Sequence, residues 1–120
     1  MHAVHTMTAH FQRREFACPH CGVALVRPKL LEHLELVRRL AGDHPLPIVS
    51  GYRCPVHNKA IGGAPDSQHM YAAAADLPAG RVNFRMAQTA GFTGIGTKGE
   101  WVTHVDVRDG ALTHWTYPPG

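Results

Sequence analysis

The fold of this chain is decided by residues 92–116, which read FTGIGTKGEWVTHVDVRDGALTHWT. β-branched and aromatic residues recur there in three runs, at 92–96, 101–107 and 111–116, and such runs are typical of β-strands. We therefore expect three strands near the end of the chain. The Asp-Gly pair at 109–110 is a strong turn signal, so the last two strands are predicted to form a hairpin.

Two segments before these strands show the apolar spacing of helices. Residues 28–41 predict the longer helix, which stops at Gly42 and carries an apolar stripe of Leu30, Leu34 and Val37. Residues 81–90 predict a shorter helix, and Gly91 is its expected cap.

The chain between these helices is predicted to contain two strands and a long loop. Residues 48–50 read as a short buried strand. Residues 72–77 fit a helix by their alanine content or a central strand by their shortness, and a strand is preferred. Residues 54–71 are punctuated by Gly and Pro and predict a loop, and a loop of this length in a small domain is usually functional. The order of elements indicates the α+β class, with helices packed on a small, mainly antiparallel sheet.

The composition is that of one globular domain. The chain has 120 residues, of which 44% are hydrophobic and 18% charged, and we expect an N-terminal arm over 1–14 and a single folded domain over 15–120. The net charge of +3 comes from scattered basic residues, so no nucleic-acid partner is expected. No apolar stretch has the roughly 18–20 residues that span a bilayer, and the N-terminus lacks the pattern of a Sec signal peptide.

Histidine is the unusual feature, with ten residues in the chain. His69, Asp76 and His104 offer two imidazoles and a carboxylate, which is a plausible catalytic zinc set. Three protein ligands leave the fourth tetrahedral position for water, and zinc lowers the pKa of that water towards about 7. This ligand pattern indicates a hydrolase, although in a histidine-rich chain it needs support from neighbouring motifs.

The neighbouring motifs resemble those of the zinc D-alanyl-D-alanine metallopeptidases. This family includes bacterial and phage enzymes that cut D-Ala-D-Ala termini or peptidoglycan cross-bridges, and it shares its fold with the hedgehog signalling domain. The resemblance covers roughly residues 15 to 116 and rests on Ser50-Gly-Tyr-Arg-Cys54, Asn58, Gly62-Gly63-Ala64, Ser67-Gln-His69, Asp76, Gly91-Phe-Thr-Gly-Ile-Gly96 and Val102-Thr-His-Val-Asp-Val-Arg108. It implies zinc ligation by His69, Asp76 and His104, and binding of a substrate carboxylate by Arg53.

The chemistry of the side chains is consistent with the roles that the resemblance implies. The guanidinium of Arg53 suits a C-terminal carboxylate because it offers a bidentate fork, and Ser67 is placed to hydrogen-bond bound peptide or the metal shell. Several family members have an acid three residues before the last histidine ligand, where this chain has Trp101. Two carboxylates remain as candidate general bases: Asp106, which shares a strand face with His104 and is preferred, and Glu100.

A second departure from the family is Ala72, at a position where relatives commonly have Gly. The added methyl group either narrows the cleft near the metal loop or fills a gap.

The three cysteines suggest a second, structural zinc site. Cys18-Pro-His-Cys21 and Cys54-Pro-Val-His57 form two knuckles that together offer three thiolates and one imidazole, from Cys18, Cys21, Cys54 and His57. The alternatives are buried free thiols, or one disulfide with the third thiol left over. A zinc site or a disulfide that includes Cys54 would brace the turn that carries Arg53.

The sequence therefore predicts a zinc peptidase domain whose partners are peptidoglycan stem peptides containing D-alanine, cut as a carboxypeptidase or as a cross-bridge endopeptidase. We expect a phage-encoded protein, cytoplasmic or virion-associated, that acts at the cell wall as a monomer or within a larger phage assembly. The main alternative is a non-catalytic zinc-binding module that keeps the fold as a structural or recognition part. A zinc ribbon that binds nucleic acid is disfavoured, since the chain has no basic stripe.

Overall fold

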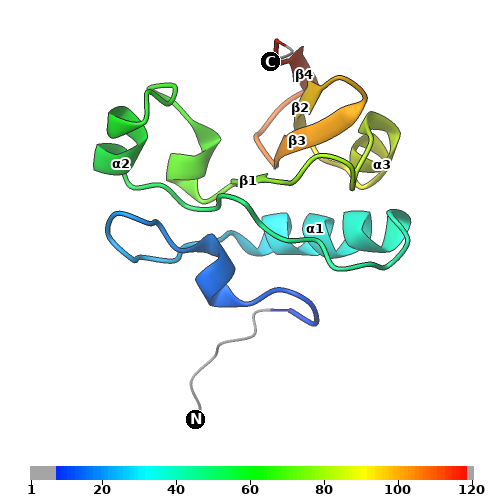
Figure 1. Ribbon diagram of the computed structural model, residues 1–120, viewed down its shortest axis with the longest axis horizontal. Coiled ribbons are helices and arrows are strands. Elements are labelled where there is room, and N and C mark those ends of the chain that lie inside the picture. The colour runs from blue at the N-terminus through cyan, green and yellow to red at the C-terminus, as the bar shows by residue number, and fades with distance from the viewer. Residues whose placement is uncertain (1–7, 119–120) are drawn as a thin grey trace.

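Four strands form one sheet in the computed structural model, which describes residues 8–118 (Figure 1). They are β1 (Ala74–Asp76), β2 (Gly94–Lys98), β3 (Trp101–Asp106) and β4 (Thr113–Thr116), in the order β1-β3-β2-β4. β3 pairs antiparallel with both β1 and β2, whereas β4 pairs parallel with β2. The α+β class and the mainly antiparallel sheet are thus confirmed.

The expected hairpin between the last two strands is wrong. The tight turn of the sheet lies instead between β2 and β3, at Gly99 and Glu100. Both edges of β3 are occupied, one by β1 and the other by β2. β4 therefore crosses over and pairs with the outer edge of β2, with Gly94 opposite Thr113.

The two predicted helices are confirmed. α1 (Pro28–Leu40) has Pro at its first position and buries Leu30, Leu31, Leu34 and Val37, and Gly42 follows with a positive φ of 101°. α3 (Phe84–Thr89) begins where the Asn83 side chain accepts a hydrogen bond from the Met86 amide at 2.9 Å. Figure 1 shows α1 running below β1 and α3 beside the β2–β3 hairpin. Within residues 8–118, no helix is long and apolar enough to cross a membrane.

Two predictions for the middle of the chain are corrected. The segment 54–71 contains two short helices, α2 (Pro55–Ala60) and the 3-10 helix η2 (Gln68–Tyr71), which are too short to show a periodic pattern. Residues 48–50 form only an isolated bridge in place of a strand. Val49 N donates to Asp76 O at 2.9 Å, and Asp76 N donates to Ser50 O at 2.8 Å.

Part of the expected N-terminal arm is packed against the domain. Residues 1–7 lie outside the described part of the chain, but Phe11 is 1% exposed, and Phe16 at the end of η1 (Arg13–Phe16) is fully buried. Both rings join the core cluster that contains the apolar face of α1, and burial of each contributes about 1.5–3 kcal/mol. His10 also contacts Glu35 of α1, with 2.6 Å between Nδ1 and Oε1. From residue 8 onward, the segment is part of the fold.

Candidate metal centre

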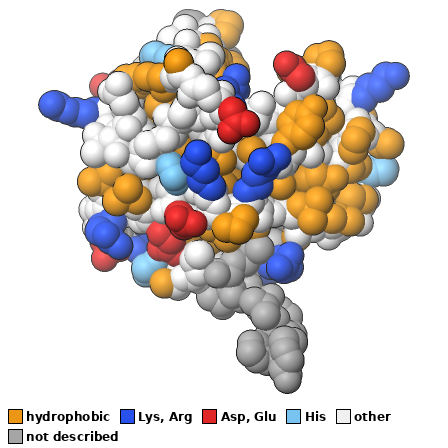
Figure 2. Space-filling model, turned by 180° about the vertical axis from the view of Figure 1, so that it is seen from behind, with side chains coloured by type: hydrophobic (Ala, Val, Ile, Leu, Met, Phe, Trp, Pro, Cys, Tyr) orange, Lys and Arg blue, Asp and Glu red, His pale blue; other side chains and the backbone are white. Residues whose placement is uncertain are grey.

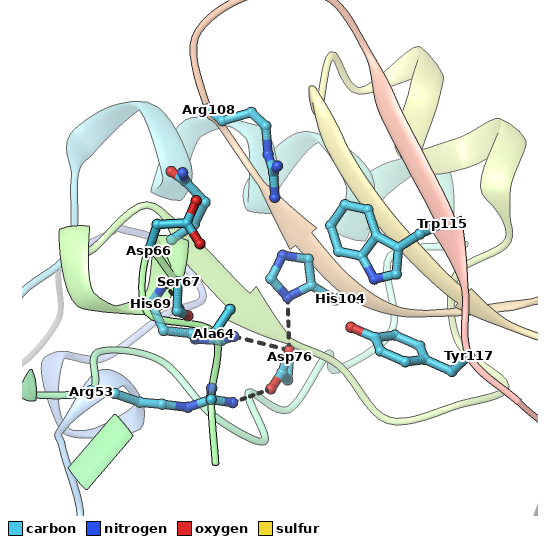
Figure 3. Close-up of a pocket in the computed structure, with 12 residues that line it drawn as sticks. Arg53, Ala64, Asp66, Ser67, His69, Asp76, His104, Arg108, Trp115 and Tyr117 are labelled. Atoms are coloured by element: carbon cyan, nitrogen blue, oxygen red, sulfur yellow. Dashed lines mark hydrogen bonds and ion pairs between the residues drawn. The ribbon is translucent and has the colours of Figure 1, made fainter. Parts of the chain in front are cut away.

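Three potential metal ligands meet where β1, β3 and η2 converge. β1 ends at Asp76, which lies opposite His104 in the antiparallel register with β3. His69 is on η2, whose first turn is capped by the Ser67 hydroxyl accepting from the His69 amide at 3.2 Å. One donor atom from each of His69, Asp76 and His104 lies within 4.8 Å of the others, and Figure 3 shows both imidazoles facing the carboxylate.

The outer nitrogen of each imidazole is already occupied by an acceptor. His69 Nδ1 is 2.7 Å from Gly51 O, and His104 Nε2 is 2.8 Å from Asp106 Oδ2. A neutral imidazole that donates from its outer nitrogen has a lone pair on its inner nitrogen. Hydrogen bonding to a backbone carbonyl or a carboxylate at the outer nitrogen is how metal-bound histidines are usually oriented.

The inner atoms form a donor set that fits zinc. His69 Nε2 and His104 Nδ1 are each 3.1 Å from Asp76 Oδ1. With neutral imidazoles, two lone pairs and a carboxylate oxygen are held in contact, an arrangement that a cation between them stabilises. Ligands on a tetrahedral zinc at its usual bond lengths are separated by about 3.4 Å, close to the spacing here.

The electrostatics favour an ionised Asp76. Burial raises its pKa, but the hydrogen bonds of His104 and His69, and the positive charge that these rings carry when protonated, outweigh burial and hold the pKa well below its usual range. Its second oxygen accepts from Arg53 Nη2 at 2.9 Å. Asp76 therefore turns Oδ1 towards the two imidazoles and Oδ2 towards Arg53.

The centre lies in a cleft with a volume of about 490 Å³. Around the three ligands, the cleft is lined by Arg53, Asp66, Ser67, Arg108, Trp115 and Tyr117, among others (Figure 3). The site thus combines a metal-binding set with two guanidinium groups and a further carboxylate.

Comparison with known proteins agrees with this geometry. The model of the peptidase M15 family matches residues 6–106. The chain belongs to this family. The zinc D-Ala-D-Ala carboxypeptidase of Streptomyces albus G is 39% identical over 92 residues, a match that covers 71% of this chain and 36% of that protein. The chain therefore spans about a third of the length of this curated relative, and the family predicted from the motifs is confirmed.

In this M15 family member, the buried position of Asp106 favours a positioning role over the predicted role of general base. Its side chain is fully buried, and Oδ2 contacts His104 Nε2 on the side of the ring away from Asp76. Arg108 donates to the same carboxylate from Nε at 2.8 Å and from Nη2 at 2.6 Å. Strand alternation correctly placed Asp106 on the same face as His104. The carboxylate nevertheless meets the edge of the ring that points away from the metal set, where it would not reach a water molecule on the metal.

Glu100, the other predicted base, lies away from this cleft. It lies on the β2–β3 turn, is exposed and does not line the cleft. It lies four positions before His104, a distance of about 13 Å along a strand. Among the described residues, the carboxylates that line the cleft are Asp76 and Asp66. Sequence reasoning missed Asp66, although it lies three residues before His69 in the loop expected to be functional.

The two predicted substrate-binding residues line the cleft. Arg53 is partly engaged, because Nη2 bonds Asp76 and Nε donates to Ser50 Oγ at 3.2 Å. Its Nη1 edge is left for a ligand. The Ser67 oxygen accepts from the His69 amide, and its hydroxyl proton remains to be donated into the cleft.

β4 supplies a wall that the sequence did not predict. Trp115 lies 5.1 Å from the His104 ring, centroid to centroid, and the Arg108 guanidinium lies 5.0 Å from the centroid of the Trp115 ring. Gly96 on β2 makes room for this indole, because a Cβ there would be 2.8 Å from Trp115 Nε1. Tyr117 stands two residues further on and also lines the cleft, so the alternation of Trp115 and Tyr117 is the signal that was available.

The second predicted metal set is only partly assembled. The sulfurs of Cys18, Cys21 and Cys54 lie within 4.8 Å of one another, but His57 joins them through its backbone amide, which donates to Cys54 Sγ at 3.4 Å. Burial opposes ionisation of Cys18, yet hydrogen bonds from the backbone of Cys54, Cys21 and His20 lower the pKa of its thiol from 9.0 to about 6.

Basic side chains are spread over the surface. Figure 2 shows Lys and Arg scattered among apolar and neutral side chains on the face drawn, with a central pair beside a histidine. No continuous basic stripe crosses that face.

Proposed function

We propose that this chain is a zinc-dependent peptidase that hydrolyses peptide bonds next to D-alanine in the stem peptides of peptidoglycan. The observation that carries the proposal is the set His69, Asp76 and His104 opening into a cleft that also contains Arg53 and Asp66. Structural zinc sites have four protein ligands, whereas catalytic sites have three and an open position. The similarity to a zinc D-Ala-D-Ala carboxypeptidase supports the substrate class.

The chain's own residues bind and orient the substrate. When bound, zinc would polarise the scissile carbonyl and lower the pKa of the attacking water. Arg53 holds the terminal carboxylate through its free Nη1 edge, next to the Asp76 oxygen that it already binds. This contact favours carboxypeptidase action on a terminal D-alanine, because the residue that leaves carries a free carboxylate.

Asp66 is the proton carrier in this proposal. Figure 3 shows its side chain in the cleft, on the same wall as Ser67. Asp66 accepts a proton from the attacking water and returns it to the nitrogen that leaves, so the amide becomes a carboxylate and a free amine. Asp106 and Ser67 act indirectly, by orienting His104 and His69.

Mass spectrometry of stem peptides tests the proposal. Purified protein with zinc is incubated with a pentapeptide ending in D-Ala-D-Ala and, separately, with cross-bridged muropeptides. Loss of one alanine from the pentapeptide is expected, and His69→Ala should abolish both metal binding at this centre and turnover. Arg53→Ala should impair the pentapeptide reaction, whereas unchanged turnover in the His69 variant would refute the catalytic assignment. A phage origin and action at the cell wall stay predictions from the sequence.

A second candidate function is a zinc-binding recognition module without hydrolysis. The observation in its favour is that neither acid expected as the base lies in the cleft. The variant Asp66→Asn separates the two candidates. A fall in turnover of about 10²–10⁴-fold with zinc binding retained supports the peptidase, and stem-peptide binding without turnover in the unmodified protein supports the module.

A further inference from the structure

We propose that Cys18, Cys21 and Cys54 hold a second zinc ion, and that His20 is its fourth ligand. The site is separate from the cleft, since none of these four residues lines it. It does not depend on the proposed peptidase function, because its role is to fasten two distant segments of the chain together.

The three sulfurs come from two structured segments. Cys18 and Cys21 lie in a tight loop closed by hydrogen bonds from Cys18 N to Val23 O and from Gly22 N to Cys18 O, both 2.8 Å. Cys54 is the residue that caps α2. All three sulfurs lie within 4.8 Å of one another, although Cys54 is far from the other two in sequence. The fold therefore presents three thiol ligands before any metal binds.

His20 contacts one sulfur of the set, and its ring must turn towards the other two, because it lies outside the group whose ligand atoms are all within 4.8 Å of one another. Its Nδ1 is 3.5 Å from Cys54 Sγ. Zinc bonds of about 2.3 Å to sulfur and about 2.0–2.1 Å to nitrogen, at a tetrahedral angle, place the two ligand atoms about 3.5 Å apart. His20 therefore needs little movement relative to Cys54, whereas the predicted ligand His57 lies on the first turn of α2 and meets that sulfur through its main chain.

Backbone amides support two of the sulfurs, those of Cys18 and Cys54, as thiolates. Cys54 N donates to Cys18 Sγ, and His57 N donates to Cys54 Sγ, both at 3.4 Å. Such donors stabilise negative charge on the sulfurs. Three neighbouring thiolates repel one another, and a divalent cation removes that repulsion. A disulfide would consume two of the sulfurs and leave the third beside His20 without a role.

The second zinc would fix the loop that serves the cleft. Cys54 follows Arg53 directly, and Arg53 N donates to His69 O at 3.2 Å. Two residues before Cys18, Phe16 O accepts a hydrogen bond from Tyr52 N at 3.0 Å, and Tyr52 directly precedes Arg53. The ion would thus clamp the N-terminal segment to the turn that carries Arg53.

Metal stoichiometry distinguishes the two zinc centres. The unmodified chain is expected to bind two zinc ions, and His69→Ala and Cys21→Ser one each. Cys21 is chosen because it is exposed, so its replacement by serine leaves the core intact. One zinc that is lost in His69→Ala and retained in Cys21→Ser would overturn this proposal alone. One zinc with the opposite behaviour would overturn the catalytic centre alone.

The identity of the ligands is tested in the His69→Ala background with cobalt(II) as the probe. Sulfur-to-cobalt charge-transfer absorption is expected and should be absent after the further change Cys21→Ser. Supporting residues already contribute about 10- to 100-fold to metal affinity, so loss of the direct ligand in His20→Ala should weaken zinc binding at least about 100-fold. His57→Ala is the matched control and should not change affinity. The reverse result, or a mapped disulfide between two of these cysteines in the zinc-loaded protein, would overturn the assignment.

Discussion

Asp106→Asn is the substitution that separates a positioning role from a proton-accepting role. The asparagine has the same size, and its carbonyl oxygen still accepts the hydrogen bond from His104 Nε2. It loses the negative charge that contacts His104 at 2.8 Å and Arg108 at 2.6 Å. That charge makes the His104 ring a better donor to a cation at Nδ1.

The expected effect falls on zinc affinity and stability. Loss of the carboxylate behind a metal-bound histidine weakens metal binding by about 10- to 100-fold, or about 1.4–2.7 kcal/mol. The ion pair with Arg108 is lost, and the amide nitrogen of asparagine replaces the oxygen that accepts from Arg108 Nε, so the free energy of unfolding should fall by about 2 kcal/mol. With zinc at saturation, kcat should fall by less than about tenfold, because the cleft groups are unchanged.

Calorimetric titration with zinc and turnover at saturating zinc measure these two quantities separately. A general base would give the opposite result, with unchanged zinc affinity and a loss in kcat of about 10²–10⁴-fold. That outcome would refute the positioning role. Glu100→Gln is the control, and it should change neither quantity because the side chain is exposed on the β2–β3 turn.

Three further substitutions test other parts of the structure. Ala72 has a left-handed φ of 58°, which costs about 1–2 kcal/mol for a residue with a Cβ. Ala72→Gly should raise the free energy of unfolding in urea by about 0.5–1 kcal/mol after the entropy of glycine is subtracted. A lower free energy of unfolding would show that the methyl group contributes to packing. A Cβ at Gly94 would lie 2.1 Å from Asp106 Oδ1, so Gly94→Ala should weaken zinc binding at least as much as Asp106→Asn, and unchanged titration would contradict this. Burial raises the pKa of Glu35, but hydrogen bonds from Thr8 and His10 lower it below the usual 4.5. Glu35→Gln should therefore be less stable than the unmodified protein at pH 7, and this difference should vanish as the pH falls through the lowered pKa. Equal urea midpoints of the two proteins at pH 7 would refute the packing of residues 8–14.

The sequence was sufficient where the signal is local or where a set of motifs acts jointly. α1 was predicted because its apolar stripe repeats over three turns and is ended by Gly42. The strands were predicted from their residue types, and alternation put His104 and Asp106 on one face. The family followed from the order and spacing of motifs across most of the chain.

The sequence was insufficient where separate segments compete for the same partner. The Asp-Gly pair at 109–110 favours a hairpin locally, but β1 already occupies the edge of β3 that such a hairpin needs. The competition is decided by tertiary packing, and its result places Trp115 over the metal centre. Likewise, alternation gives the face of Asp106 but not the side of the His104 ring that it meets, and this side decides its chemical role.

The segment 50–54 explains how so small a domain positions its cleft. Ser50 O accepts from the Asp76 amide at 2.8 Å, and Gly51 O accepts from the His69 ring. Gly51 is also pressed on Phe16, where an added Cβ would lie 2.6 Å from the Phe16 Cα. Since five consecutive residues orient two ligands and carry Arg53, a small shift of this segment disturbs all three at once. A zinc ion bound at Cys54 would restrain the segment at its end, which gives the cysteine cluster a physical reason to lie next to Arg53.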